Sequence, residues 1–233
     1  MLFRLPNVSQ ATGFFPEAPN VSINGANSLY NNYMIDGMDN NEQFLGGQKF
    51  AAPIGFVQNV TVLTNNYSVE FGNSGNGIIN YTSKSGSNEF TGEAFFVNRP
   101  GPVIDGKTPY PQRDLSGNQV QNGFKRYQGG LAFGGAIIKD KTFYYVDIEH
   151  TTDLKDNVLS SPSLGVNETV QGENKFDYFS AKIDQHWSSK FISSLRTNLG
   201  LVNIGRQAGG LTGGVSFPSA ANSQDRNSLL IAN

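Results

Sequence analysis

The chain has 233 residues, no cysteine, a net charge of −2 and a mean hydropathy of −0.35. The absence of cysteine excludes disulfides, zinc–thiolate sites and thiol catalysis, and the weak net charge provides no basic field for nucleic acid. No apolar run approaches the roughly 20 residues of a membrane-spanning helix, although a membrane-spanning strand needs only about 9–11. With 27 glycines and 12% aromatic residues, the composition predicts a turn-rich, mainly β protein of one or two domains.

The region up to Asn88 alternates short strand candidates with loops rich in asparagine and glycine. Strands are expected at residues 20–23, 32–35, 56–64 and 77–83. The run Ser85-Gly86-Ser87-Asn88 predicts a turn before the next strand. We therefore expect a domain boundary at about 88/89, which divides the chain into residues 1–88 and 89–233.

Longer strands are expected in the second region, at residues 90–98, 124–138, 142–152, 177–187, 191–203 and 226–232. Their connections alternate in length: 139–141 and 188–190 are tight turns, whereas 99–123, 153–175 and 204–222 are long and polar. Outer-membrane barrels combine short periplasmic turns with longer extracellular loops. The pattern therefore favours antiparallel transmembrane strands, with the first of them running outward.

Side chains alternate along these strands, so one face suits lipid and the other suits water. Water or the lumen should be faced by Ser180, Lys182, Asp184, Ser194 and Arg196, and lipid by Phe179, Ile183, Leu195 and Leu199. A soluble antiparallel sandwich shares this alternation. The loop lengths favour the barrel.

Several short motifs follow one another over residues 21–96. They are Ile23-Asn24-Gly25, Met34-Ile35-Asp36-Gly37-Met38-Asp39, Val57-Gln58-Asn59-Val60-Thr61-Val62-Leu63, Tyr67-Ser68-Val69-Glu70-Phe71-Gly72 and Gly77-Ile78-Ile79-Asn80-Tyr81-Thr82-Ser83-Lys84-Ser85-Gly86. Their order resembles the second half of the plug domain of a TonB-dependent outer-membrane receptor. The resemblance is strongest to the branch with a carboxypeptidase-regulatory-like domain ahead of the plug.

The resemblance implies a mainly β fragment: the C-terminal part of a plug, followed by the first antiparallel strands of a truncated transmembrane β-barrel. It implies transport rather than catalysis, in the outer membrane of a Gram-negative bacterium and without a cofactor. The implied partners are the TonB complex, acting through a segment outside this sequence, an extracellular nutrient ligand of unknown identity, and outer-membrane lipid. We also expect a fragment because residues 1–6 do not resemble a signal peptide and no TonB box is evident.

The loop 38–53 matches the family position of an apical plug loop. Its candidate ligand-facing residues are Asp39, Asn40, Gln43, Phe44, Gln48 and Phe50. No metal site is expected, because His150 and His186 fall in different strand candidates and no ligand pattern surrounds them.

Two alternatives remain. A secreted β-sandwich adhesin could bind glycans through aromatic loop residues such as Tyr110 and Phe124, and its apolar strand faces would point into a shared core. A hydrolase could use Asp147 and Glu149, which lie two apart on one strand face.

Overall fold

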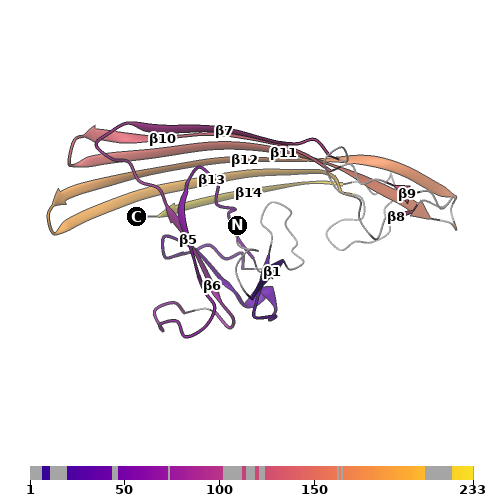
Figure 1. Cartoon of the computed structure of the whole chain (residues 1–233), viewed down its shortest axis with the longest axis horizontal. Coiled ribbons are helices and arrows are strands. Elements are labelled where there is room, and N and C mark those ends of the chain that lie inside the picture. The colour runs from indigo at the N-terminus through magenta and orange to yellow at the C-terminus, as the bar shows by residue number, and fades with distance from the viewer. Residues whose placement is uncertain are drawn as a thin grey trace.

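The computed structural model describes residues 7–10, 20–43, 47–72, 74–101, 112–113, 119–120, 124–161, 163, 165–207 and 222–232. Two β-sheets dominate these residues: one long, curved sheet and one small sheet that lies against its concave side (Figure 1). No helix in the described ranges is long and apolar enough to cross a membrane.

The large sheet contains six antiparallel strands in the order β14-β13-β12-β11-β10-β7. Each strand pairs with the strand of this sheet that comes next along the chain, as in an up-and-down barrel. The sheet is open between β7 and β14. The strands are β7 (Thr91–Arg99), β10 (Lys125–Ile138), β11 (Thr142–Ser161), β12 (Val166–Ser188), β13 (Phe191–Gln207) and β14 (Asn222–Ala232).

All six predicted strands of the second region are confirmed, but the prediction of a long loop at residues 153–175 is wrong. The strands β11 and β12 continue as a paired hairpin to Ser161 and Val166. The sequence signal ends earlier because alternation marks only strands with one apolar face. A short hairpin of β8 (Gln112–Arg113) and β9 (Gln119–Val120) lies within the predicted loop 99–123, and most of the connection 204–222 lies outside the described residues.

The predicted alternation between two faces is confirmed by burial, while contact of the apolar face with lipid stays a prediction. Ser180, Asp184 and Arg196 are buried on the concave face, whereas Phe179, Ile183 and Leu195 are exposed on the convex face. We call the concave face of the large sheet the wall. The exposed apolar rows contradict the core that the sandwich alternative requires among these strands.

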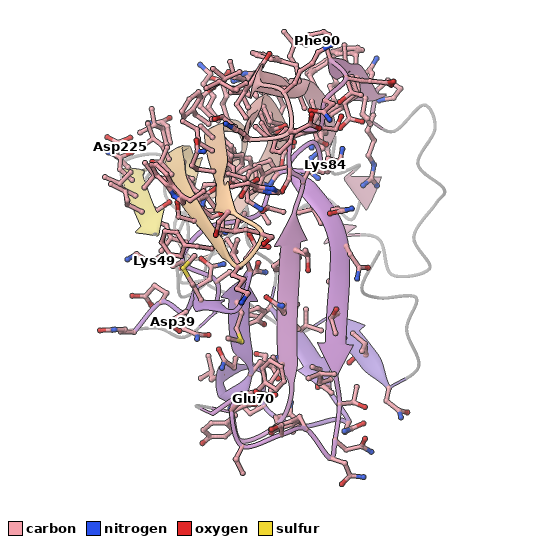
Figure 2. All side chains as sticks on the ribbon, turned by 90° about the vertical axis from the view of Figure 1, so that its left-hand side faces the viewer. Asp39, Lys49, Glu70, Lys84, Phe90 and Asp225 are labelled. Carbon is pink, nitrogen blue, oxygen red and sulfur yellow. The ribbon has the colours of Figure 1, made fainter. Side chains whose placement is uncertain are left out.

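The small sheet has the order β4-β3-β6-β5, with β3 parallel to β6 and the other pairs antiparallel. Its strands are β3 (Asn32–Ile35), β4 (Met38–Asp39), β5 (Val57–Leu63) and β6 (Ile78–Ser83). A separate antiparallel pair is formed by β1 (Val8–Gln10) and β2 (Val21–Ile23). A 3-10 turn, η2, spans Ser28–Tyr30. The core of this region consists of Val8, Val21, Ile23, Tyr33 and Ile79. Figure 2 shows β5 and β6 running away from the wall, from Lys84 beside the large sheet to Glu70 at the far end.

The linker between β6 and β7 passes very close to the wall. A Cβ at Gly86 would lie 2.3 Å from the backbone oxygen of Tyr144 and 2.5 Å from that of Gly135. Because β6 and β7 belong to different sheets, no strand pairing crosses this turn, as the sequence predicts. The boundary at 88/89 itself stays a prediction.

Candidate functional site

An ion pair joins the two sheets where β3 ends. Asp36 lies in the turn between β3 and β4 with a φ of 48°, a left-handed conformation that aspartate tolerates better than most residues. Its Oδ2 lies 2.5 Å from Nη2 of Arg196 on β13, whose side chain is only 6% exposed. Asp36 also accepts hydrogen bonds from the amide (2.7 Å) and hydroxyl (2.5 Å) of Ser83 at the end of β6. The carboxylate therefore ties two strands of the small sheet to the wall.

Lys182 extends this polar contact along β12. Its Nζ donates to the hydroxyls of Ser83 (3.2 Å) and Ser85 (2.8 Å) and lies 3.8 Å from the carboxylate of Asp184. Asp184 in turn accepts a hydrogen bond from Ser194 on β13. The contact therefore comprises charge-assisted hydrogen bonds between charged side chains and serine hydroxyls or carboxylates. These hydrogen bonds can break and reform without a covalent change.

A second polar contact lies on β11. The amide of Ile54 donates to Oε2 of Glu149 (3.0 Å), and the hydroxyl of Tyr145 donates to the carbonyl oxygen of Gly55 (2.9 Å). A Cβ at Gly55 would lie 2.0 Å from Oδ1 of Asp147, so only glycine permits this close approach. The carboxylates that the hydrolase alternative would use therefore face the small sheet and are buried against it.

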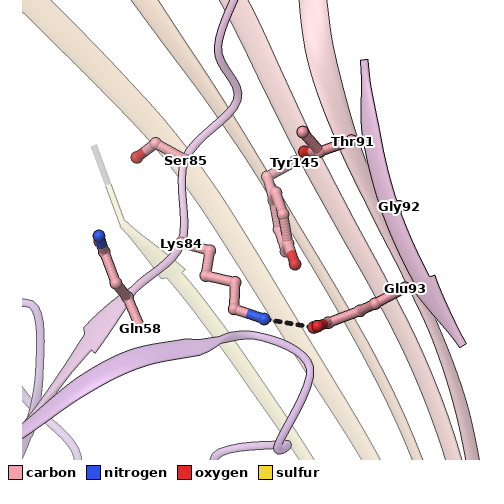
Figure 3. A pocket seen from close by; sticks show the side chains of 7 residues that line it. All are labelled: Gln58, Lys84, Ser85, Thr91, Gly92, Glu93 and Tyr145. Carbon is pink, nitrogen blue, oxygen red and sulfur yellow. Dashed lines mark hydrogen bonds and ion pairs between the residues drawn. The ribbon is translucent and has the colours of Figure 1, made fainter. Parts of the chain in front are cut away.

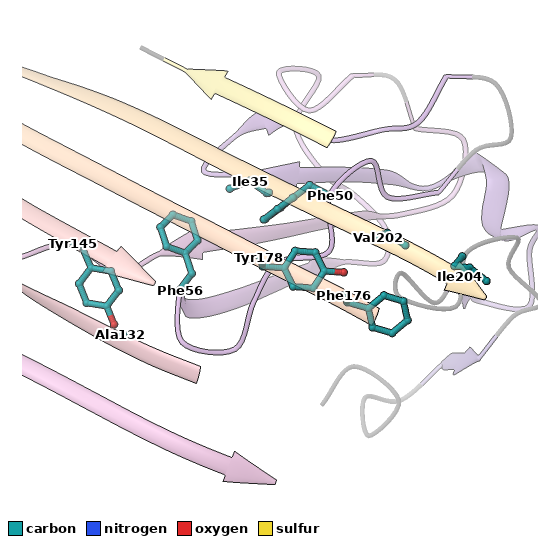
Figure 4. Packing of buried hydrophobic residues seen from close by; sticks show 9 residues of the cluster. All are labelled: Ile35, Phe50, Phe56, Ala132, Tyr145, Phe176, Tyr178, Val202 and Ile204. Carbon is teal, nitrogen blue, oxygen red and sulfur yellow. The ribbon is translucent and has the colours of Figure 1, made fainter. Parts of the chain in front are cut away.

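Apolar side chains fill the space between these polar contacts. Figure 4 shows Ile35, Phe50 and Phe56 of the small sheet and its loops packed on wall residues. The wall contributes Ala132, Tyr145, Phe176, Tyr178, Val202 and Ile204. The contact between the two sheets thus combines a buried apolar core with charged side chains that are also buried.

The loop between β4 and residue 50 is closed by its own hydrogen bonds. The side chain of Asn40 donates to the carbonyl oxygen of Phe50 (2.9 Å) and accepts from its amide (3.0 Å). A bridge between Asn41 and Gln48, and a hydrogen bond from the amide of Glu42 to the oxygen of Gly47 (3.0 Å), continue the pairing toward the tip.

The six candidate ligand-facing residues fall into different environments in this loop. Asp39 and Gln43 are exposed, whereas Asn40, Gln48 and Phe50 are 0%, 4% and 1% exposed. Phe44 lies outside the described residues. Ligand contact by any of the six stays a prediction, but only Asp39 and Gln43 among the five described can reach a ligand without rearrangement.

A pocket of about 260 Å³ lies where the linker leaves the small sheet (Figure 3). It is lined by Gln58, Lys84, Ser85, Thr91, Gly92, Glu93 and Tyr145. Lys84 of the linker forms an ion pair with Glu93 on β7, and its ammonium group lies 5.9 Å from the centre of the Tyr145 ring. Partial burial lowers the pKa of Lys84, but the hydrogen bond to Glu93, the coulombic influence of Tyr145 and the charge of Glu93 outweigh it and raise the pKa above its ordinary value. The ammonium group of Lys84 therefore stays charged at neutral pH.

The histidines do not assemble a metal site. His150 pairs with Asp177 at 2.5 Å and with the hydroxyl of Thr152 at 2.9 Å on the outward face, while His186 packs edge-on against Phe143. No group of three potential metal-ligating His, Asp or Glu side chains occurs in the part of the chain that the structure describes.

Two family models match the chain: the TonB-dependent Receptor Plug Domain over residues 1–78 and the Outer membrane beta barrel domain over residues 82–175. The chain is 33% identical over 163 residues to the TonB-dependent transporter Oar of Myxococcus xanthus. It belongs to the TonB-dependent receptors. The small sheet is the plug, the large sheet is part of the barrel, and the family resides in the outer membrane of Gram-negative bacteria.

The aligned region is 67% of this chain and 15% of Oar, so the receptor activity of a whole relative involves much that lies beyond this sequence. The outer membrane transporter YddB from Escherichia coli shares the fold with a TM-score of 0.62 at 18% identity, over 80% of this chain and 27% of that one. These matches confirm the predicted receptor family and fold. The branch with the additional N-terminal domain stays a prediction.

The sequence missed the partners across the plug–wall contact. Alternation alone places Arg196 and Asp184 on the inward face. A buried arginine requires a carboxylate partner, which is a signal that a partner exists, but several acidic residues of the plug region meet that requirement equally well. Only the fold selects Asp36.

Proposed function

We propose that the receptor containing this chain binds an extracellular nutrient at the plug loop 38–53 and imports it with energy from the TonB complex. The observation that carries the proposal is that the plug is packed on the barrel wall through breakable hydrogen bonds and a compact apolar contact. A plug held in this way closes the space beside the wall at rest and can still be displaced when work is done on it.

The ligand contacts we propose are Asp39 and Gln43, with Phe44, which follows Gln43 in the sequence, as a further candidate. A carboxylate and an amide together recognise hydrogen-bond donors and polar groups on a ligand. Asn40, Gln48 and Phe50 support the loop in this proposal, since their side chains are buried. The outward apolar rows, which include Phe179 and Ile183, contact outer-membrane lipid.

Uptake by cells that express the full-length receptor tests the transport proposal. Ferric chelates, cobalamin, oligosaccharides and peptides would be supplied separately to cells with and without a functional TonB complex. We expect one class to be accumulated only when both the receptor and TonB are present. Equal accumulation without TonB would contradict energy coupling.

Binding of that ligand by purified full-length variants tests the site. Replacement of Asp39 or Gln43 by alanine should each weaken binding by about 1–3 kcal/mol, the range for an important contact. Glu70→Ala is the matched control, because Glu70 is exposed at the far end of the plug (Figure 2). Unchanged affinity in both loop variants would remove these two residues from the site.

A further inference from the structure

The ring of Phe50 occupies a recess in the barrel wall. It is 1% exposed and packs edge-on against Tyr178, with ring centres 5.4 Å apart. Tyr178 on β12 is directly opposite Gly200 on β13, and a Cβ at Gly200 would lie 3.2 Å from Cδ2 and 3.3 Å from Cε2 of the Phe50 ring. The aromatic ring therefore fills the space that the missing side chain leaves beside Tyr178.

The same residue closes the loop that carries Asp39 and Gln43. Its amide and carbonyl both bond to the side chain of Asn40, and the amide of Lys49 donates to the backbone oxygen of Asn40 at 2.8 Å. The outgoing arm of the loop is held by the plug itself, since the amide of Asn40 donates to the oxygen of Tyr33 at 2.9 Å. The returning arm is held by Asn40, by the bridge between Gln48 and Asn41 and by the hydrogen bond between Gln48 and Tyr81 of the plug, and its last residue, Phe50, is held by the wall as well.

We propose that Phe50 is a positioning residue, whose seat between Tyr178 and Gly200 fixes the end of the returning arm and thereby the part of the loop that carries Asp39 and Gln43. The inference rests on the proposed role of this loop in ligand binding and adds the means by which the barrel holds it. It assigns Phe50 a contact with the wall instead of the ligand contact that the sequence predicts. Movement of the plug along β12 and β13 must unseat this ring.

Hydrogen exchange of the full-length receptor, read by mass spectrometry without any ligand, tests the inference. The amides of Glu42, Lys49 and Phe50 report on the loop because each is hydrogen-bonded within it. Phe50→Ala removes the ring and should speed their exchange at least about tenfold, because loss of a buried aromatic lowers the free energy of local opening. Phe56→Ala is the matched control: that ring is equally buried on the wall but lies outside the loop, so the three amides should keep their protection.

A second variant changes the barrel side of the same contact. Gly200→Ala leaves the loop sequence intact but places a methyl group against the Phe50 ring, and should also speed exchange of the three amides. The hydroxyl of Ser228, 2.8 Å from the added Cβ, can rotate away, whereas the buried ring of Phe50 must shift as a whole to make room for the methyl group. Combining Gly200→Ala with Phe50→Leu, which removes Cε2 and replaces the rigid ring by a smaller side chain, should restore part of the protection.

Full protection of the loop in both Phe50→Ala and Gly200→Ala would overturn the inference, as would loss of protection in Phe56→Ala of the same size. A failure to find the transported ligand would leave the outcome of this experiment unaffected, because the measurement uses the unliganded receptor.

Discussion

Arg196 and Asp36 are two charges drawn from distant parts of the chain into one buried contact. Their side chains are 6% and 15% exposed, and both are further hydrogen-bonded, Arg196 to the oxygen of Ile35 at 3.5 Å and Asp36 to Ser83. A buried pair of this kind is a weak source of stability as a whole, but loss of one partner leaves the other charge uncompensated. The contact therefore determines where the plug sits more than how tightly it is held.

Arg196→Gln should destabilise the seating of the plug by about 3 kcal/mol, because it leaves Asp36 buried without a cation. Hydrogen exchange of residues 78–83 in the full-length receptor would measure this. A double-mutant cycle with Asp36→Asn should show coupling between the two sites. Lys175→Gln is the control, since Lys175 pairs with Glu173 in an exposed ion pair; an equal effect of both changes would argue against a special role for Arg196.

Gly86 is the residue where the linker has the least freedom. Gly86→Ala would force a methyl group against the backbone of two barrel strands, and should destabilise the plug–barrel junction by about 1–3 kcal/mol. Proteolysis of the linker in the folded receptor should become faster. At Gly72 an added Cβ meets no atom within 4 Å. In the Gly72→Ala variant the linker should therefore be cleaved at the wild-type rate. Identical proteolysis of both variants would contradict the close approach at Gly86.

At the scale of whole strands, the alternation of apolar and polar side chains sets both position and orientation. The exposed fractions of Phe179, Ile183 and Leu195 on the convex face are 38%, 42% and 53%, while Ser180 between them in the sheet is fully buried. The facing of β12 and β13 therefore follows from the alternation in their own sequences.

Ile183→Arg should cost about 2–4 kcal/mol if the side chain lies near the middle of the bilayer. Equilibrium unfolding of the full-length receptor from lipid vesicles would measure the change. Ser180→Ala alters the opposite face and introduces no charge, so it serves as a control with a much smaller expected effect. A tolerated arginine at position 183 would indicate that this face is not in lipid.

The same alternation explains which elements the sequence predicts and which it does not. The starts of β11 and β13 are predicted to the residue, because tight turns and amphipathic patterns coincide there, and the start of β10 after a long loop is predicted to within one residue. The outer halves of β11 and β12 are missed, since the sequence there lacks the regular alternation of apolar and polar residues by which the other strands are predicted. Phe50 and Asn40 are predicted as ligand contacts because they lie in a polar loop, and their burial depends on a wall that local sequence cannot reveal.

For the molecule as a whole, the balance between buried and exposed apolar surface is unusual for a water-soluble protein. The plug and the wall bury their apolar side chains against each other, but the convex face exposes large ones that include Ile148, Leu195 and Leu201. The edges of β7 and β14 also have no strand partner within the described sheet. Such surfaces require lipid, detergent or further protein.

A polypeptide of residues 1–233 expressed by itself should therefore associate in detergent-free buffer. Light scattering should detect large particles, and calorimetry should show no sharp unfolding transition. A monomer that melts cooperatively in the same buffer would contradict this expectation. Addition of a mild detergent should reduce the particle size, because it covers the convex face.

The hairpin of β11 and β12 extends past both neighbouring strands. Pairing with β10 ends at Leu154 and pairing with β13 ends at Glu173, so residues 155–161 and 166–172 bond only to each other. At about 3.3 Å per residue, this part adds roughly 23 Å to the wall. Because these residues pair neither with β10 nor with β13, we expect insertions and substitutions there to leave the rest of the wall and the seat of the plug unchanged. Evolution can therefore remodel what the receptor presents to its surroundings while its transmembrane architecture stays unchanged.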